Sequence, residues 1–143
     1  MKAENYIKLE FPARSVNEGF ARAAAAAFVS QLDPTLTELG DIKTAVSEAV
    51  TNAVVHAYPN AIGVVQLRAR ILQGGELEIV VKDKGVGIPD VERARTPLYT
   101  TGGEDRSGMG FTIMEGFMDK LRVRSAPGRG TTVTMRRRLQ GRG

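Results

Sequence analysis

The sequence of 143 residues contains no cysteine, no tryptophan and a single histidine. Without thiols it can form no disulfide and no thiolate metal site, and one imidazole excludes a His-rich zinc site. Its longest apolar run, Ala23 to Val29, is far shorter than the roughly 20 residues that cross a bilayer. The N-terminus also lacks the pattern of a signal peptide, so we expect a cytoplasmic protein with no membrane partner.

The chain carries only a slight excess of positive charge, because it has 20 Lys and Arg residues and 16 Asp and Glu residues, for a net charge of +4. Four arginines crowd near the C-terminus, at positions 136, 137, 138 and 142. No helix-turn-helix, zinc or RNP-type motif accompanies them. We therefore interpret the end of the chain, from about residue 137 to 143, as a solvated basic tail, and expect no direct contact with nucleic acid.

Hydrophobic periodicity indicates a chain of alternating strands and helices. Apolar residues at every second position predict strands over residues 7–11, 65–71, 77–81, 121–124 and 132–135. Helices are expected after Ser15, after Pro34 and over residues 110–117. The order predicts an α/β (α+β) two-layer sandwich, with a mixed, largely antiparallel sheet and helices on one face. The length suits one domain, residues 1–143.

The first expected helix begins with a possible capping box, because Ser15 is followed three residues later by Glu18. Its apolar spacing predicts a buried side made of Val16, Phe20, Ala24, Ala27 and Phe28. Arg22 would then face away from the core.

Glu48 and Asn52 lie one turn apart in the second expected helix, on a face away from its apolar stripe. A carboxylate and an amide oxygen so placed suit Mg²⁺, which prefers oxygen ligands and keeps waters and substrate phosphates in its shell. Glu48 could instead orient an attacking hydroxyl. The alternative for both residues is an ordinary solvated helix face.

Asp83 has the same strand parity as Leu77, Ile79 and Val81, so its carboxylate is expected to point inward. A buried carboxylate needs a partner, and the N6 amino group of adenine is a donor where guanine has an acceptor. This would select ATP over GTP. Gly85 and Gly87 would leave room for the flat base, although a Gly-rich turn capped by aspartate is a common structural alternative.

Residues 84–110 show no strong period and contain several glycines and prolines, so we expect a long loop that acts as a lid. It ends in Ser107-Gly108-Met109-Gly110, just before the third helix, where backbone N–H groups would face phosphate oxygens. Arg106 immediately precedes this segment in the sequence. The glycine-lysine-serine or glycine-lysine-threonine ending of a P-loop is missing. The three motifs together predict an ATP site.

These motifs, with Gly130-Thr131-Thr132, resemble in order the N, G1 and G2 boxes and terminal threonine of the Bergerat (GHKL) ATPase/kinase superfamily, which includes gyrase, MutL and histidine kinases. The longer phrases at residues 47–53 and 107–115 resemble the bacterial anti-sigma factor serine kinases, above all the sporulation branch. The likeness runs from Ile7 to about Val133.

The resemblance implies roles for individual residues. Glu48 would be the catalytic base, Asn52 the Mg²⁺ ligand and Asp83 the contact to the adenine amine, helped by Thr131. The remaining nucleotide contacts would be Gly85, Gly87, Arg106, Ser107, Gly108, Met109 and Gly110. Arg22 matches a position that contacts both the sigma factor and the anti-anti-sigma protein.

The same resemblance implies a homodimer that binds ATP or ADP, sequesters a sporulation sigma factor and phosphorylates a serine on an anti-anti-sigma protein of the STAS type. Two alternatives stay close to it: a nucleotide-dependent anti-sigma binding module without kinase activity, and an anti-sigma kinase of a stress-response sigma factor. A hydrolase fragment like the ATPase halves of gyrase or MutL is a third possibility, against which the chain length argues.

Overall fold

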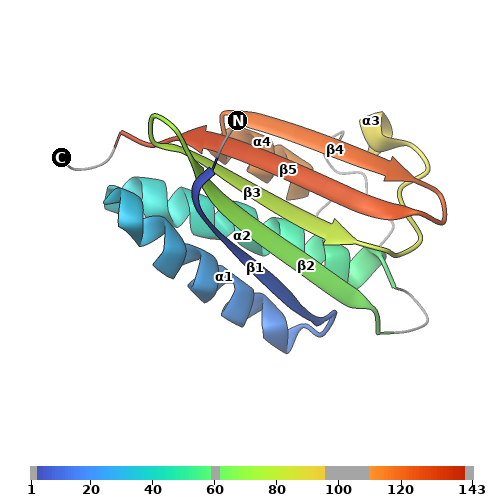
Figure 1. Ribbon diagram of the computed structural model, residues 1–143. Coiled ribbons are helices and arrows are strands. Elements are labelled where there is room, and N and C mark those ends of the chain that lie inside the picture. The colour runs from blue at the N-terminus through green and yellow to red at the C-terminus, as the bar shows by residue number, and fades with distance from the viewer. Residues whose placement is uncertain (1–2, 59–61, 96–109, 141–143) are drawn as a thin grey trace.

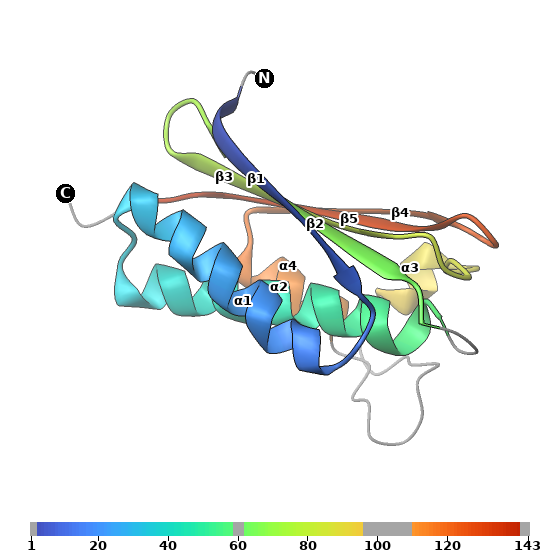
Figure 2. The same ribbon diagram turned by 60° about the horizontal axis from the view of Figure 1, so that its bottom comes forward.

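The computed structural model describes residues 3–58, 62–95 and 110–140. In these ranges the chain folds into two layers, with helices α1, α2 and α4 on one face of a five-stranded sheet (Figures 1 and 2). The strand order is β1-β2-β3-β5-β4, and each neighbouring pair is antiparallel. The predicted two-layer α+β sandwich is confirmed. Its elements are β1 (Ala3–Pro12), α1 (Val16–Val29), a 3-10 turn η1 (Ser30–Leu32), α2 (Leu36–His56), β2 (Val64–Leu72), β3 (Glu76–Asp83), α3 (Val91–Ala94), α4 (Gly110–Phe117), β4 (Lys120–Ala126) and β5 (Gly130–Arg138).

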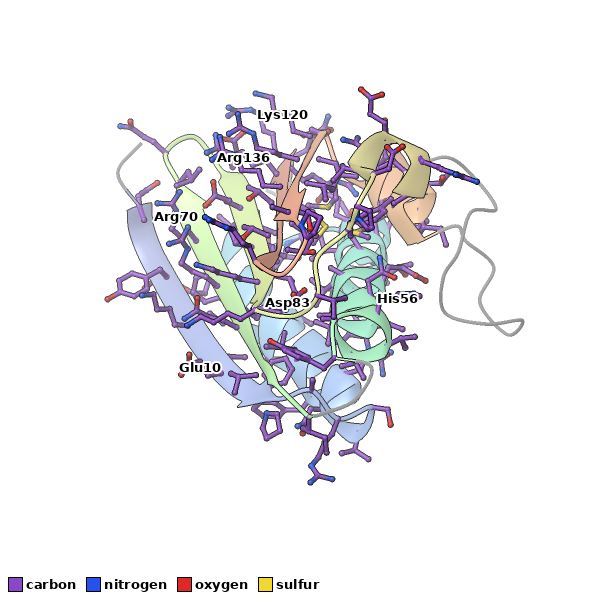
Figure 3. The ribbon with its side chains drawn as sticks, turned by 90° about the vertical axis from the view of Figure 1, so that its right-hand side faces the viewer. Glu10, His56, Arg70, Asp83, Lys120 and Arg136 are labelled. Carbon is purple, nitrogen blue, oxygen red and sulfur yellow. The ribbon has the colours of Figure 1, made fainter. Side chains whose placement is uncertain are left out.

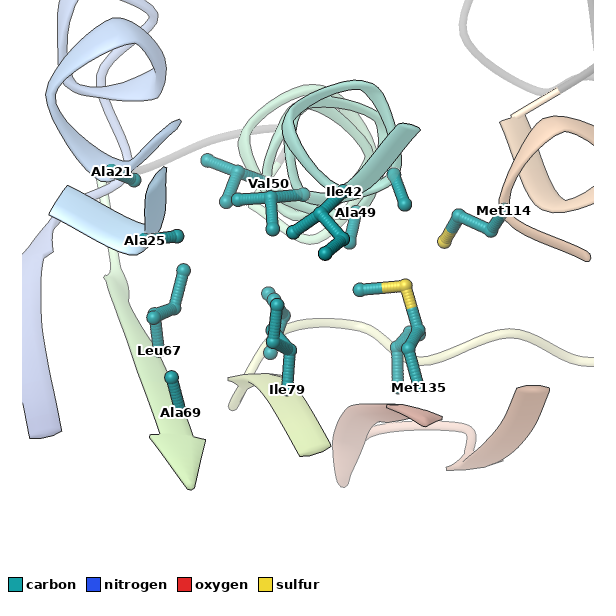
Figure 4. Packing of buried hydrophobic residues seen from close by; sticks show 14 of the residues in the cluster. Ala21, Ala25, Ile42, Ala49, Val50, Leu67, Ala69, Ile79, Met114 and Met135 are labelled. Carbon is teal, nitrogen blue, oxygen red and sulfur yellow. The ribbon is translucent and has the colours of Figure 1, made fainter. Parts of the chain in front are cut away.

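The core lies between the sheet and the central helix α2. The predicted apolar stripe of α2 is buried, and it packs over the inward side chains of β2, β3 and β5 (Figure 4). Met114 from α4 and Met135 from β5 fill the side of the core next to α2. Because α2 is held along its apolar face, its polar faces are fixed in direction. Within the described ranges, no helix is both long and apolar enough to cross a membrane.

Helix α1 is rotated relative to the sequence prediction, which was right about Phe28 but wrong about Val16, Phe20 and Ala27. Val16 and Phe20 are 79% and 59% exposed, and the residues that are buried are Ala21, Ala25, Phe28 and Val29. The run of alanines offers small side chains on every face, so apolar spacing does not determine which face packs. The small side chains of Ala21 and Ala25 are the ones that face the core.

The capping box is also at a different helix from the one predicted. The Ser15 side chain makes no capping hydrogen bond, and Glu18 bonds to α2 instead. A reciprocal capping box is present at Thr35 and Glu38, at the start of α2. This anchors the beginning of the helix that carries Glu48 and Asn52.

The predicted strands at residues 65–71 and 77–81 form an antiparallel hairpin, with its turn at Gly74 and Gly75, whose φ angles of 80° and 79° favour glycine. Its register places Asp83 opposite Val65 on one side and opposite Thr131 of β5 on the other. Asp83 is therefore the last residue of a central strand, on the face that the helices cover.

The basic tail was predicted to begin too early, because β5 continues to Arg138. Arg137 forms an ion pair with Asp41 at 2.8 Å, and Arg136 forms one with Glu78 at 2.7 Å. Burial alone would raise the pKa of Glu78, but hydrogen bonds and charges from Arg70 and Arg136 outweigh it and lower the pKa. These arginines hold the sheet together and are not a solvated tail.

Candidate active site

Helix α2 presents Glu48 and Asn52 to the first residue of α4, as the three motifs together required. A side-chain carbon on Gly110 would lie 3.1 Å from Asn52 Nδ2 and 3.3 Å from Glu48 Oε2. Only a glycine lets the backbone approach both groups so closely without displacing them. The carboxylate, the amide and the N-terminus of an eight-residue helix therefore meet at one place.

Asp83 lies between the sheet and α2 (Figure 3), and its residue is 6% exposed. Its Oδ1 accepts two backbone N–H groups, from Gly85 at 3.0 Å and from Thr131 at 3.2 Å. Burial raises the pKa of this carboxyl, and the two hydrogen bonds only partly oppose that shift. Both recorded bonds go to Oδ1, so within the described residues Oδ2 is left as the acceptor for a ligand.

On the side where a side chain would project, Gly85 and Gly87 face neighbouring backbone and not the open space that the sequence interpretation assumed. The position of a Gly85 side chain is already filled by the carbonyl oxygen of Ala57, and that of Gly87 by the carbonyl oxygen of Ala126. Val86 also donates its N–H to the Ala57 carbonyl at 2.8 Å. The glycines thus dock the loop after Asp83 against the end of α2 and against the β4–β5 turn. This docking helps to set the position of Asp83, to which Gly85 also donates its N–H.

Two hydroxyl groups that the sequence did not point to hold the same loop. Tyr58 accepts the N–H of Lys84 at 2.7 Å and donates to the carbonyl of Val64 at 2.8 Å. Ser125 accepts the N–H of Ile88 at 2.7 Å. Neither residue belongs to a motif or a periodic pattern, so only the fold reveals them.

Thr131 contributes to the site chiefly through its backbone. Its N–H bonds to Asp83, while its hydroxyl lies 2.8 Å from the hydroxyl of Ser125. Arg22 lies outside the core, as predicted, and its side chain is 42% exposed. It lies where α1 meets α2, in contact with Ser47, the residue before Glu48.

The predicted phosphate contacts Arg106, Ser107, Gly108 and Met109 lie outside the described residues, as does most of the predicted lid. Within the described ranges, no three acidic or histidine side chains gather into a metal site. The oxygen atoms of Glu48 and Asn52 nevertheless fit an ion that shares its shell with phosphates and water, as Mg²⁺ does.

A buried carboxylate at a strand end, and an acid and an amide on a helix facing the start of another helix, define a nucleotide-binding domain of the histidine kinase type. The family model described as "Histidine kinase-like ATPase domain" matches residues 11–137. Anti-sigma F factors from Caldanaerobacter subterraneus subsp. tengcongensis and Pasteuria penetrans are 55% and 57% identical to this chain. The matches cover 94% of both chains in the first case, and 95% of this chain and 92% of the relative in the second. The chain belongs to the histidine kinase-like ATPase family and, within it, to the anti-sigma F factors.

Solved structures agree on the fold. The histidine kinase domain of a blue-light activated kinase from Erythrobacter litoralis is 27% identical, with a TM-score of 0.59, covering 85% of this chain and 61% of that one. The RsbU and RsbW domains of a Mycobacterium tuberculosis protein give a TM-score of 0.69 at 21% identity, covering 94% of this chain and 32% of that one. The second likeness shows the fold alone.

Proposed function

We propose that this chain is an ATP-dependent protein serine kinase that also sequesters a sigma factor, and that its protein substrate is an anti-anti-sigma protein of the STAS type. The single observation that carries the kinase part is the meeting of Glu48 and Asn52 with Gly110 at the start of α4. The sigma-factor part rests on the anti-sigma F factors to which the chain is similar over nearly its whole length.

The two ends of the site fit the two ends of ATP. Asp83 offers a buried acceptor for the adenine amino group, and the N-terminus of α4 favours the negative charge of phosphates. Asn52 would hold Mg²⁺, which would neutralise charge on the phosphates when bound. The ATP site thus needs residues from β3, α2 and α4, which the sheet and the core hold in fixed relative positions.

Glu48 would accept the proton of the substrate serine. In the transfer, a bond forms between the serine oxygen and the γ-phosphorus, the bond from that phosphorus to ADP breaks, and the hydroxyl proton passes to the Glu48 carboxylate. Most of the rate enhancement in such a reaction comes from positioning and charge stabilisation, so the carboxylate has only to orient the hydroxyl and take its proton.

Further parts of the proposal come from the resemblance to this class of kinases. They are a homodimer, a sigma factor of sporulation and contact of Arg22 with both partners. The alternatives are a nucleotide-dependent binding module without transfer, or a kinase that serves a stress-response sigma factor. Glu48 discriminates against the pure binding module, which would have no need for a carboxylate beside the phosphate end of the site.

The test of the kinase is Glu48→Gln, assayed with Mg·ATP and the cognate anti-anti-sigma protein. We expect wild-type protein to produce phosphoserine, and the variant to lose transfer by about a hundredfold or more while still binding ATP. Glu10→Gln, on the exposed edge strand β1, is the matched control and should behave as wild type. A fully active Glu48→Gln variant would remove Glu48 from the reaction.

The test of the partner surface is charge reversal at Arg22. Arg22→Glu should weaken co-purification with the sigma factor and leave ATP affinity within about twofold, because Arg22 is on α1, which supplies none of the proposed nucleotide contacts. Arg14→Glu is the control, since Arg14 is exposed and precedes α1. An intact sigma-factor complex with the Arg22 variant would exclude this contact.

A further inference from the structure

An open groove of about 430 Å³ runs along α2, beside the start of the candidate active site. Its lining residues on α2 recur every three or four positions and therefore form one helical face. Arg22 of α1 completes the lining, whose α2 members are Gly40, Lys43, Thr44, Ser47 and Glu48. Two cationic side chains thus border a groove that reaches the proposed catalytic carboxylate.

A hydrogen-bond network fixes Arg22 in this groove. The Ser47 hydroxyl donates to Glu18 Oε1 at 2.6 Å. The Arg22 guanidinium lies 3.3 Å from the same carboxylate oxygen and 3.4 Å from the Ser47 hydroxyl. Without these contacts, Arg22, whose side chain is 42% exposed, would be free to sample many rotamers.

The network is incomplete within the described residues. Glu18 Oε2 is buried there and has no hydrogen-bond partner, although a buried carboxylate oxygen normally has one. This oxygen is enclosed in the contact between α1 and α2, beside the groups that fix Arg22.

Glu48 connects the groove to the phosphate end of the ATP site. It lines the groove, and its Oε2 also lies close to Gly110 at the start of α4. A hydroxyl lying at the Glu48 end of the groove would therefore be next to the proposed phosphate position. The groove is open to a protein segment along its length, whereas the adenine contact Asp83 is buried between the sheet and α2.

From this arrangement, and resting on the proposed kinase function, we propose that the groove receives the serine-bearing segment of the protein substrate. Ser47 is a positioning residue in this scheme. Together with Glu18 it fixes the orientation of Arg22, and Arg22 holds the segment against Glu48. The cations Arg22 and Lys43 fit carbonyl or carboxylate groups that flank the target serine. Ser47 touches neither the nucleotide nor the transferred phosphoryl group in this scheme. Its effect passes through Arg22.

The experiment measures steady-state phosphorylation of the cognate anti-anti-sigma protein by Ser47→Ala, with KM determined separately for protein and for ATP. Loss of a hydrogen bond to a charged group should raise the KM for the protein about tenfold, with the KM for ATP changed by less than about twofold. Ser47→Thr keeps the hydroxyl and should restore the wild-type KM. Ser30→Ala, at an exposed serine whose hydroxyl bonds only within α1, is the matched control.

A double-mutant cycle separates positioning from a general weakening of the α1–α2 contact. If Ser47 acts through Arg22, adding Ser47→Ala to Arg22→Ala should raise the KM for the protein no further. Additive effects, or a Ser47→Ala variant with a wild-type KM, would overturn this inference while leaving the kinase intact. A wild-type protein that transfers no phosphate would instead overturn the proposed function, and the inference with it. Thermal unfolding of each variant identifies any that fails to fold.

Discussion

Replacing Asp83 by asparagine tests the adenine end of the site with little disturbance of the fold. The new amide oxygen can take the place of Oδ1 and keep the hydrogen bonds from Gly85 and Thr131. The amide NH₂ then lies at Oδ2, where the adenine amino group would meet a donor instead of an acceptor. Losing a hydrogen bond to a charged group costs about 1.5–3 kcal/mol, which corresponds to roughly a 10- to 150-fold weaker affinity for ATP.

Stability should change in the opposite direction from affinity. Because burial raises the pKa of Asp83, the folded state binds its proton more tightly than the unfolded chain does. Protonated Asp83 therefore stabilises the folded state. This stabilisation is fully present below the ordinary pKa of an aspartate, and is lost as the pH rises through the raised pKa. At neutral pH the variant avoids this cost, so Asp83→Asn should unfold at the same or a higher temperature than wild type. Its advantage should shrink as the pH falls through the raised pKa.

Titration with fluorescent ATP and GTP analogues, together with thermal unfolding, measures both effects. The ratio of GTP to ATP affinity should rise in Asp83→Asn, because the amide can donate to the guanine oxygen. Asp119→Asn is the control, since its carboxylate also accepts a backbone N–H but is exposed at the start of β4. Unchanged ATP affinity in a folded Asp83 variant would refute the adenine contact. Weaker binding that accompanies a loss of fold would refute the stability argument.

Two further predictions concern the frame around the site. Gly85→Ala places a carbon where the Ala57 carbonyl lies, and should destabilise the protein by roughly 1–3 kcal/mol in denaturant unfolding, whereas Gly116→Ala, in open space on α4, should stabilise it slightly. Equal stability of these two variants would contradict the role given to Gly85. Glu78→Gln should cost roughly 1–3 kcal/mol at neutral pH, because three arginines, Arg68, Arg70 and Arg136, lose their carboxylate partner. Since the folded pKa of Glu78 is lowered, this difference should vanish as the pH falls through that pKa, and a difference that persists in acid would rule out the ion pairs as its source.

The sequence predicted the structure best where a hydrophobic pattern is long and regular. The apolar stripe of α2 and the alternation in β2 and β3 each decide which face of the element is buried. They therefore also place Glu48 and Asn52 away from the apolar stripe of α2, and Asp83 on the inward face of β3. The short boxes contain residues that the fold brings together, such as Glu48, Asn52 and Gly110, but a box does not show what fills the space around its glycines. Gly85 and Gly87 were chosen for the space beside them, and that space is filled by backbone carbonyls.

The sequence prediction was wrong where the local pattern does not decide which face of an element is buried or which residues it contacts. The alanine-rich α1 can bury almost any face, so its rotation is decided by α2 and the sheet. Arg136 and Arg137 look like part of a tail in sequence, but their carboxylate partners lie in β3 and α2. A charge pattern alone does not show where the opposite charges will be.

By itself, the sequence of this anti-sigma F family member determined its main helices and strands and its fold class, because helix and strand periods are properties of neighbouring residues. The tertiary structure alone decided how those residues act together. Ser47 bonds to Glu18, 29 positions away, and Asp83 to Thr131, 48 positions away. Contacts between such distant positions form only when the core fixes the distance and orientation of the elements, so no local pattern encodes them.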